Sequence, residues 1–350
     1  MSERLAPEQF DSLPDAPEPA ENPHLFGHAE AIDLIASAYR SGKLHHALLL
    51  TGPKGIGKAT FAFHLAHHLI RHPGAAEAPD RFATPDPASS LSRQIASGAH
   101  PAVLHLTRPY DDKTKKFRGA ITVDEIRKVA RFLSMRSHDD SYRVVIVDPA
   151  DDMNRNAANA LLKNLEEPPA RAIFLLISHA PGALLPTIRS RCQVLRMSPL
   201  SVEDVDQVLK SFGSGLPADP AARAALTERA GGSARQAILM TQHGGFEITE
   251  AADKFLAQKR RDPAEAYRLA DAVAGREQAV PFAILNEHLM DRIASEASLA
   301  AERGDARRAH RLAELFREAN TAIVETETYN LDKRQHVVGL LNRIGEAFAV

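Results

Sequence analysis

Residue types that can bind phosphate occur together at residues 51–60, Thr-Gly-Pro-Lys-Gly-Ile-Gly-Lys-Ala-Thr. Gly52, Gly55 and Gly57 allow the backbone to curl so that successive N–H groups point inward, and Lys58 can reach terminal phosphates. An apolar run comes before this stretch and a helical pattern begins at Lys58, so a helix N-terminus adds its positive dipole end. The pattern predicts a P-loop for ATP or ADP. A glycine-rich turn without a ligand is the alternative, and the occupancy of the loop stays open.

The residue after the P-loop lysine departs from the usual pattern. It is Ala59, where a P-loop has a serine or threonine whose hydroxyl binds Mg²⁺. Thr60 does not simply replace that hydroxyl, because one residue along a helix turns the side chain by about 100°. We count Thr60 with the three glycines and Lys58 among the candidate nucleotide-binding residues.

A second candidate is Asp148, which ends the apolar run that begins at Arg143. In P-loop ATPases an aspartate at the carboxyl end of a buried strand holds Mg²⁺. The next residue is Pro149, where an active ATPase of the AAA+ kind usually has a glutamate that polarises the attacking water. Asp151 and Asp152 lie close by, but as a helix-starting pair they are expected to cap the following helix. The two departures predict a site that holds nucleotide without hydrolysing it.

Composition sets the broad class of the protein. A length of 350 residues predicts two or three domains, and 44% hydrophobic residues indicate a globular chain. The net charge is −2, so any contact with nucleic acid must come from a local patch. Cys192 is the only cysteine, which excludes an internal disulfide and a multi-cysteine zinc site. No apolar run reaches the roughly 20 residues of a membrane span, and residues 1–4 are not typical of a signal peptide. We therefore expect a cytoplasmic protein without membrane contact.

The elements that must position these residues follow from the hydrophobic pattern. Residues 23–198 alternate apolar strand-like runs with helical patterns, which predicts an α/β core with a parallel sheet flanked by helices. Residues 1–22 are rich in proline and acidic residues, and we predict that they form a disordered arm. The predicted strands are 47–50, 102–107, 143–148, 172–178 and 193–197, and the main helices of the core are 29–39, 58–71, 122–133 and 153–167.

Beyond residue 198 every pattern is helical. Residues 199–248 contain three short helical segments, and residues 249–350 contain apolar stripes at spacings of three and four, which is typical of helices packed in a bundle. The stripes are Phe282, Leu285, Leu289 and Ile293; Leu312, Phe316, Ala319 and Ile323; and Val337, Leu341, Ile344 and Phe348. Such stripes are more often internal core than a contact between subunits.

Two other patterns have more than one interpretation. His64, His68 and His72 recur at a spacing of four residues, which could be a metal stripe. No carboxylate completes it, so we expect a solvated or partner-facing side of the helix. Lys113, Lys115, Lys116 and Arg118 predict a hairpin tip or loop, which is solvated by default and could contact nucleic acid or a partner.

Several stretches together resemble the clamp loader subunits of bacterial DNA polymerase III, within the AAA+ family. The most specific are Asn-Ala-Leu-Leu-Lys-Asn-Leu-Glu-Glu-Pro-Pro at 159–169 and Ser-Arg-Cys at 190–192. Supporting matches are His-His-Ala-Leu-Leu at 45–49, Gly-Gly-Ser-Ala-Arg at 231–235 and Asn-Leu-Asp at 330–332. The resemblance covers residues 23–350. It implies an AAA+ core over 23–198, a small helical lid over 199–248, and an all-α collar over 249–350 that assembles with other subunits.

The resemblance also implies roles for single residues. Arg191 matches the arginine finger of the family, which would reach ATP held by a neighbouring subunit; a surface arginine or a helix C-cap is the alternative. Arg235 matches the arginine that senses the γ-phosphate within its own subunit, and a structural salt bridge is an equal alternative. Ser178 takes the first sensor position.

The departures from the family's motor subunits resemble its delta-prime branch, the rather rigid stator. Motor subunits have serine or threonine after the P-loop lysine, glutamate after the strand aspartate, and usually four zinc-binding cysteines. This chain differs in all three, and residues 73–98 replace the zinc module without cysteines, so no zinc is expected. The resemblance implies a hydrolysis-deficient component of the DNA polymerase III holoenzyme that is not catalytic alone. Its implied partners are the gamma/tau and delta subunits and, through the complex, the sliding clamp and primed DNA.

Two other functions stay open at this point. One is an active gamma/tau-like motor subunit in which Thr60 and Asp151 or Asp152 replace the missing groups. ATP turnover by the purified chain would distinguish it from a stator. The other is a nucleic-acid-binding protein that acts through residues 113–118, against which the near-neutral charge argues.

Overall fold

The computed structural model describes residues 4–14, 16–134, 141–258, 261–275 and 278–349. The chain divides into two compact units, residues 1–236 and 237–350. The division falls inside α9 (Ala234–Gln242), within the region predicted as a lid. None of the helices in these described ranges is long and apolar enough to cross a membrane.

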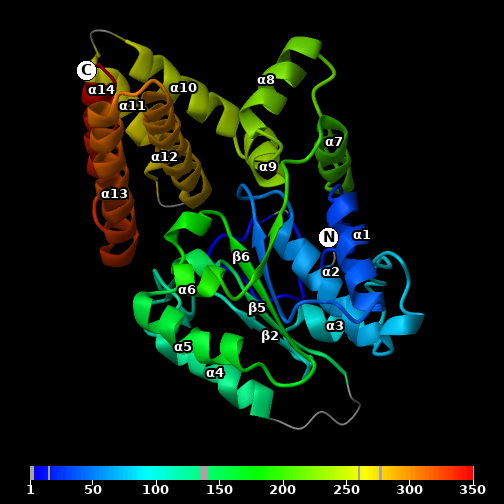
Figure 1. Ribbon diagram of the computed structural model, residues 1–350. Helices are drawn as coiled ribbons and strands as arrows, with labels where there is room; N and C mark the ends of the chain where they lie inside the picture. Colours follow the sequence, from blue (N-terminus) through cyan, green and yellow to red (C-terminus); the bar gives the residue numbers. More distant parts are fainter. Residues whose placement is uncertain (1–3, 15, 135–140, 259–260, 276–277, 350) are drawn as a thin grey trace. The chain divides into compact units, whose positions relative to one another are not determined.

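The first unit is built on a five-stranded parallel sheet in the order β2-β5-β6-β1-β7 (Figure 1). Each predicted strand forms. β6 lies between β1 and β5 and pairs with both of them in parallel. The strands are β1 (Ala47–Thr51), β2 (Val103–Leu106), β5 (Arg143–Val147), β6 (Ala172–Ser178) and β7 (Gln193–Arg196). Because all five run in the same direction, residues that follow β1, β5 and β6 meet at one edge of the sheet.

Two helical layers cover the two faces of the sheet (Figure 1). Side chains alternate along each strand, so Leu48 and Leu50 of β1 pack with the α2 layer, while Leu49 packs with the α5 layer. The first layer contains α1 (Ala29–Arg40), α2 (Lys58–Arg71) and α3 (Ser90–Ala96). The second layer contains α4 (Val123–Ser134), α5 (Arg155–Glu166) and α6 (Pro186–Arg189). The predicted α/β core is therefore confirmed.

The first unit also contains a small hairpin and two further helices. β3 (Tyr110–Asp111) and β4 (Lys116–Phe117) pair antiparallel, as the basic stretch predicted. Asp111 Oδ1 accepts hydrogen bonds from the N–H groups of Lys113 and Thr114 and so closes the turn. α7 (Val202–Ser211) and α8 (Pro220–Ala230) follow the sheet, and each is preceded by a residue whose side chain caps the helix.

The prediction of a disordered arm differs from the structure. Residues 4–14 and 16–22 fold back on the first unit, and the side chains of Ala6, Leu13 and Glu18 are buried. Arg4 donates to the carbonyl oxygens of Leu13 (2.6 Å) and Ala16 (2.8 Å). The arm is rich in proline and acidic residues, but its own polar groups pair with one another, and this local pairing stabilises a chain segment whose composition alone indicates disorder.

The expectation of a solvated histidine side on α2 is wrong. His64 and His68 are buried, and the His64 ring hydrogen-bonds to the carbonyl oxygen of Asn22 in the arm (3.0 Å). His68 packs against Tyr39 and Phe82. Among the described residues, no group of three or more His, Cys, Asp or Glu is placed to hold a metal ion. The histidine spacing therefore marks a helix face that packs inward.

The second unit is all-helical. Its helices are α10 (Gly245–Ala257), α11 (Pro263–Val273), α12 (Ala279–Glu302), α13 (Ala306–Tyr329) and α14 (Lys333–Ala349). The first apolar stripe is buried throughout, and Leu312 and Ala319 of the second are buried with it. Phe316, also in the second stripe, is 37% exposed. The stripes therefore form one core, and one turn of α13 presents an apolar side chain to solvent.

Candidate nucleotide-binding site

The P-loop connects β1 to α2 at the edge of the sheet where strands end. Gly52 and Gly55 have φ angles of +149° and +77°, which residues that carry a Cβ rarely adopt. A Cβ at Gly52 would lie 2.3 Å from the carbonyl oxygen of Met197, and one at Gly55 would lie 2.4 Å from the Cβ of Arg235. Gly57, also at positive φ, comes directly before α2. Both the conformation and the close packing explain why glycine occupies these positions.

Lys58, the first residue of α2, is buried, with 3% of its surface exposed. Its ammonium group donates to the carbonyl oxygen of Gly52 at 2.7 Å and to that of Pro53. Burial lowers the pKa of Lys58 to about 8, and the carboxylates of Asp148 and Asp151 oppose that shift. The lysine thus points into the loop, where it can meet an anion.

The two residues after Lys58 pack toward the interior of the first unit. Ala59 packs against the apolar cluster between α2 and the sheet. Thr60 is also buried, and its assignment to a nucleotide site stays a prediction. The glycine backbone and Lys58 fit the phosphates of a nucleotide. The usual Mg²⁺ hydroxyl is absent from position 59.

Asp148 follows β5 at the same sheet edge, and its N–H donates to the carbonyl oxygen of Leu106 (2.9 Å). Burial, followed by the carboxylate of Asp11, raises the pKa of Asp148 to about 7, and Lys58 acts in the opposite direction. A basic loop and an acidic strand end thus meet as predicted. An unexpected acidic residue from the arm joins them.

The prediction that Asp151 and Asp152 cap the next helix is wrong. Asn154 caps α5 instead, since its side chain accepts from the N–H of Ala157. Asp151 accepts from the hydroxyl of Ser178 (2.6 Å) and from the N–H of His179 (2.5 Å). Asp152 forms a two-pronged ion pair with Arg108 (2.5 and 3.0 Å). Both carboxylates are already engaged within the chain.

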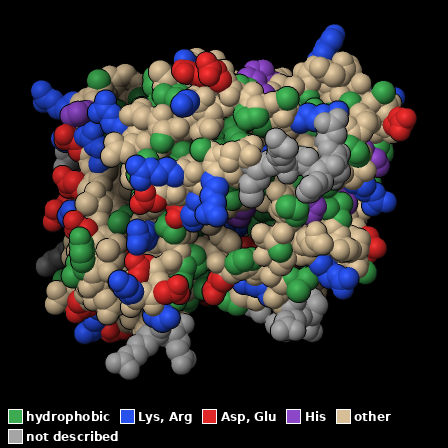
Figure 2. Space-filling view, turned by 90° about the horizontal axis from the view of Figure 1, so that it is seen from below, with side chains coloured by type: hydrophobic (Ala, Val, Ile, Leu, Met, Phe, Trp, Pro, Cys, Tyr) green, Lys and Arg blue, Asp and Glu red, His purple; other side chains and the backbone are tan. Residues whose placement is uncertain are grey.

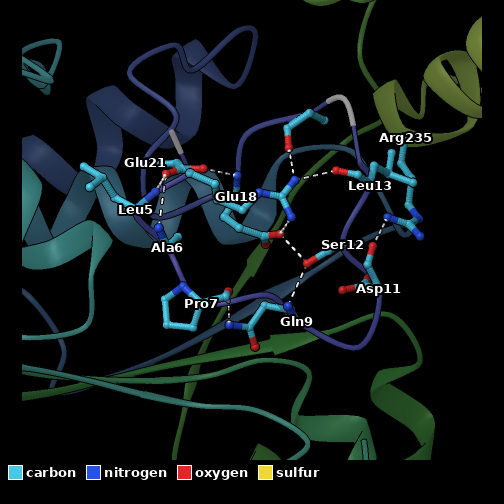
Figure 3. Close-up of polar contacts among 12 residues, drawn as sticks. Leu5, Ala6, Pro7, Gln9, Asp11, Ser12, Leu13, Glu18, Glu21 and Arg235 are labelled. Carbon is cyan, nitrogen blue, oxygen red and sulfur yellow. Dashed lines mark hydrogen bonds and ion pairs between the residues drawn. The ribbon is translucent and has the colours of Figure 1, made fainter. Parts of the chain in front are cut away.

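Arg235 lies beside the P-loop. Its N–H donates to the carbonyl oxygen of Gly55 (3.3 Å), and its guanidinium donates to the carbonyl oxygen of Asp11 (2.5 Å; Figure 3). The structure therefore brings Arg235 to the loop that the sequence assigned to it, although more than 170 residues separate the two. The sensing role remains a prediction.

Two histidines at the site were not identified from the sequence. A ring nitrogen of His28 donates to the carbonyl oxygen of Ile56 in the P-loop (2.7 Å). His179 follows Ser178, and burial, followed by the charge of Lys58, lowers the pKa of His179 to about 3. The only sequence signal for His28 was its place directly before a helical pattern. His179 could have been found from its place after a predicted strand.

Arg191 lies away from these groups. It comes two residues before β7, and Gln193, the first residue of β7, pairs in register with Leu48, near the start of β1. The P-loop begins after the last residue of β1. Arg191 therefore lies at the edge of the sheet where the strands begin, and the P-loop lies at the edge where the strands end. The Arg191 side chain is 34% exposed, and its guanidinium forms an ion pair with Glu166 (2.6 Å). Burial raises the pKa of the adjacent Cys192 thiol to about 12, so that thiol is unreactive at neutral pH.

The strand order, in which β6 separates the P-loop strand β1 from the strand β5 that carries the acidic residue, is that of a P-loop α/β core. The chain belongs to the family described as DNA polymerase III, delta subunit, whose model matches residues 27–201.

Two relatives are named as subunits of DNA polymerase III. The chain is 37% identical over 220 residues to DNA polymerase III subunit delta' of Pseudomonas aeruginosa, which covers 61% of this chain and 62% of the relative. It is 29% identical over 223 residues to DNA polymerase III subunit gamma of Buchnera aphidicola, which covers 63% and 57%. The chain thus spans about three fifths of each of these relatives. A solved gamma subunit-related protein from Thermotoga maritima is 18% identical, covers 91% of this chain and 98% of its own, and superposes with a TM-score of 0.40.

Proposed function

We propose that this chain is a delta-prime-like stator of the DNA polymerase III clamp loader. In this role it keeps a hydrolysis-deficient P-loop and supplies Arg191 to ATP held by a neighbouring motor subunit. The observation that carries the proposal is the separation of the two sites. Arg191 comes before β7, whereas the P-loop follows β1, at the opposite edge of the same parallel sheet. This separation supports a role for Arg191 in trans rather than at its own P-loop.

The chemistry of phosphoryl transfer gives such an arginine a large effect. The transferred phosphoryl group spreads negative charge over its oxygens, and an arginine supplied in trans is worth about 10³–10⁵ in rate. Arg191 is partly exposed and already paired with one carboxylate, Glu166. A γ-phosphate offers more negative charge and three acceptor oxygens, so Arg191 would exchange Glu166 for the phosphate when a motor subunit docks.

Hydrolysis by this chain alone lacks both required groups. Ala59 provides no hydroxyl for Mg²⁺, and Pro149 provides no base. Asp151 and Asp152, the carboxylates that could have replaced the base, are held by Ser178 and Arg108 respectively. These contacts favour the stator over the gamma/tau-like motor.

The proposed partners are other subunits of the loader. The relatives named above are a delta' and a gamma subunit of DNA polymerase III. We assign residues 199–248 to a lid and residues 249–350 to a collar that assembles with the collars of gamma/tau and delta subunits. The sliding clamp and primed DNA would be reached through the assembled complex.

The test is ATP hydrolysis by a reconstituted loader in which only the motor site beside this chain is active. The other motor P-loops are inactivated by lysine-to-alanine substitution. Arg191→Ala in this chain is expected to lower turnover about 10³-fold, and Arg189→Ala, an exposed neighbour on α6, serves as the matched control. Unchanged turnover with Arg191→Ala would refute the trans role.

A further inference from the structure

The N-terminal arm has a shaped tip, residues 9–13, that is held by the arm itself (Figure 3). The N–H of Gln9 donates to the hydroxyl of Ser12 (2.7 Å), and that hydroxyl donates to the buried carboxylate of Glu18. Arg4 pairs with Glu18 at 3.5 Å and also holds the carbonyl oxygen of Leu13. The tip is therefore a braced turn with Asp11 in its middle.

This tip lies against the nucleotide-binding residues. The carbonyl oxygen of Asp11 accepts from Arg235 at 2.5 Å, and its carboxylate lies 3.9 Å from the ammonium group of Lys54 in the P-loop. Next to it, the Phe10 ring stacks under the guanidinium of Arg108, with 4.2 Å from the ring centre to the guanidinium carbon. Arg108 in turn holds Asp152, so both sides of the tip contact the edge of the sheet where nucleotide would bind.

Asp11 lies among cationic groups that could face the phosphates of a nucleotide. A P-loop cation and the arginine matched to γ-phosphate sensing both contact Asp11. Asp11 is also close enough to Asp148 to raise the pKa of that carboxyl group. Asp11 thus brings one negative charge among the groups that would face a nucleotide's phosphates.

We propose that the arm tip is an internal ligand of the nucleotide site, with Asp11 in the place of a phosphate group beside Lys54 and Arg235. Nucleotide then binds this chain only when the tip leaves. The inference rests on the P-loop being a nucleotide site and is independent of the role of Arg191 in trans.

The ion pair between Asp11 and Lys54 is weak enough for a nucleotide to displace the arm tip. The side chains of Asp11 and Lys54 are 34% and 35% exposed, and an ion pair at that exposure is weak. A nucleotide diphosphate carries more charge and can use the inward-pointing N–H groups of the loop as well. The arm would therefore set a threshold concentration for nucleotide and would keep the site closed below it.

The test is calorimetric titration of the full-length chain with ADP, with and without Mg²⁺. The variant Phe10→Ala with Asp11→Ala removes both side-chain contacts of the tip and is expected to bind ADP at least tenfold more tightly than the wild-type chain. Glu8→Ala, an exposed acidic residue of the same arm, is the matched control and should leave the affinity unchanged. Adding Lys58→Ala to the double variant should abolish the gain, because the tighter binding must occur at the P-loop.

Amide hydrogen exchange on the wild-type chain gives a second measurement that needs no variant. Saturating ADP is expected to accelerate exchange at residues 9–13 at least tenfold, because the tip is released when nucleotide enters. Equal ADP affinity of the wild-type chain and the double variant would overturn the proposal. So would unchanged exchange at the tip under saturating ADP, or a lack of ADP binding by every variant. None of these results depends on turnover in the assembled loader.

Discussion

The P-loop edge and the Arg191 edge of the sheet differ in how their charges are satisfied. At the P-loop edge, Lys58 is buried and bonded to its own loop, and Asp151 is bonded to the end of β6. At the other edge, Arg191 is partly exposed and has one exchangeable carboxylate partner, Glu166. The first edge is a site whose charges are paired within the chain. The second presents a cation that a partner can recruit.

This difference indicates which edge can tolerate change. Adding an atom where side chains are tightly packed lowers the free energy of unfolding, whereas an exposed ion pair contributes little to it. Substitutions at the P-loop edge should therefore alter the free energy of unfolding, and those at the Arg191 edge should alter function in the complex. The predictions below test that division.

The largest stability effect is expected from Gly55→Ala. An added Cβ would lie 2.4 Å from both Arg235 Cβ and Ser233 Oγ, at a φ of +77°. Overpacking and the positive φ together should lower the free energy of unfolding by about 2–4 kcal/mol, measured by urea denaturation. Gly98→Ala is the control, because its φ is +70° but no atom lies within 4 Å. It should cost about 1 kcal/mol, and equal losses for the two variants would contradict tight packing of the P-loop against Ser233 and Arg235.

Acid should destabilise the α2 layer next. Burial lowers the pKa values of His67 and His68 to about 4, from an ordinary 6.5. The folded state holds these rings in the neutral form. Their contribution to the stability of the protein is therefore fully present above pH 6.5 and is lost as pH falls from 6.5 toward 4. Each contributes up to about 3 kcal/mol over that window.

The measurement is the free energy of unfolding as a function of pH for His68→Phe. The phenylalanine should reduce the loss of stability between pH 6.5 and 4 without lowering stability at pH 7, since His68 lies between aromatic rings. His310→Gln, at an exposed position of α13, is the control and should leave the pH profile unchanged. A steep profile that survives His68→Phe would show that the acid sensitivity comes from other groups.

A smaller effect is expected from Glu166→Gln. Both side chains of the pair between Arg191 and Glu166 are partly exposed, so its loss should change the free energy of unfolding by less than about 1 kcal/mol. Turnover in the reconstituted loader should change less than about threefold, because the charge of Arg191 remains. A loss as large as that of Arg191→Ala would mean that Glu166 itself acts at the neighbouring ATP.

The smallest effect is expected at the hairpin between β3 and β4. Basic and acidic side chains are interspersed on the face shown in Figure 2, and Arg118 is paired with Asp111. Lys113→Ala with Lys115→Ala should leave DNA binding by the isolated chain unchanged at about 0.1 M salt. A strongly salt-dependent affinity that these substitutions remove would favour the nucleic-acid-binding function instead.

The sheet, its flanking helices and the P-loop could be predicted because their signals are local. Buried parallel strands are continuous apolar runs, and the glycines of residues 52–57 are required by positive φ angles within one turn. The meeting of Lys58 and Asp148 followed from a general rule about strand ends. Arg235 was placed by resemblance to a family rather than by any local pattern.

The rest depended on packing that a single sequence does not encode locally. The arm has the composition of a disordered segment, yet a network between Arg4, Ser12 and Glu18 orders it. The spacing of the histidines on α2 indicated a common face but not which way that face points. Asp151 is a residue type that commonly caps helices, but its carboxylate accepts a hydrogen bond from Ser178, 27 residues away.

The most direct test of the account compares two variants of this chain in the same reconstituted loader, with one neighbouring motor site active. The measured quantity is the steady-state rate of ATP hydrolysis. The account predicts that Arg191→Ala lowers the rate about 10³-fold and that Lys58→Ala leaves it unchanged. The reverse result, with turnover lost on Lys58→Ala and kept on Arg191→Ala, would identify this chain as a motor and contradict the central claim.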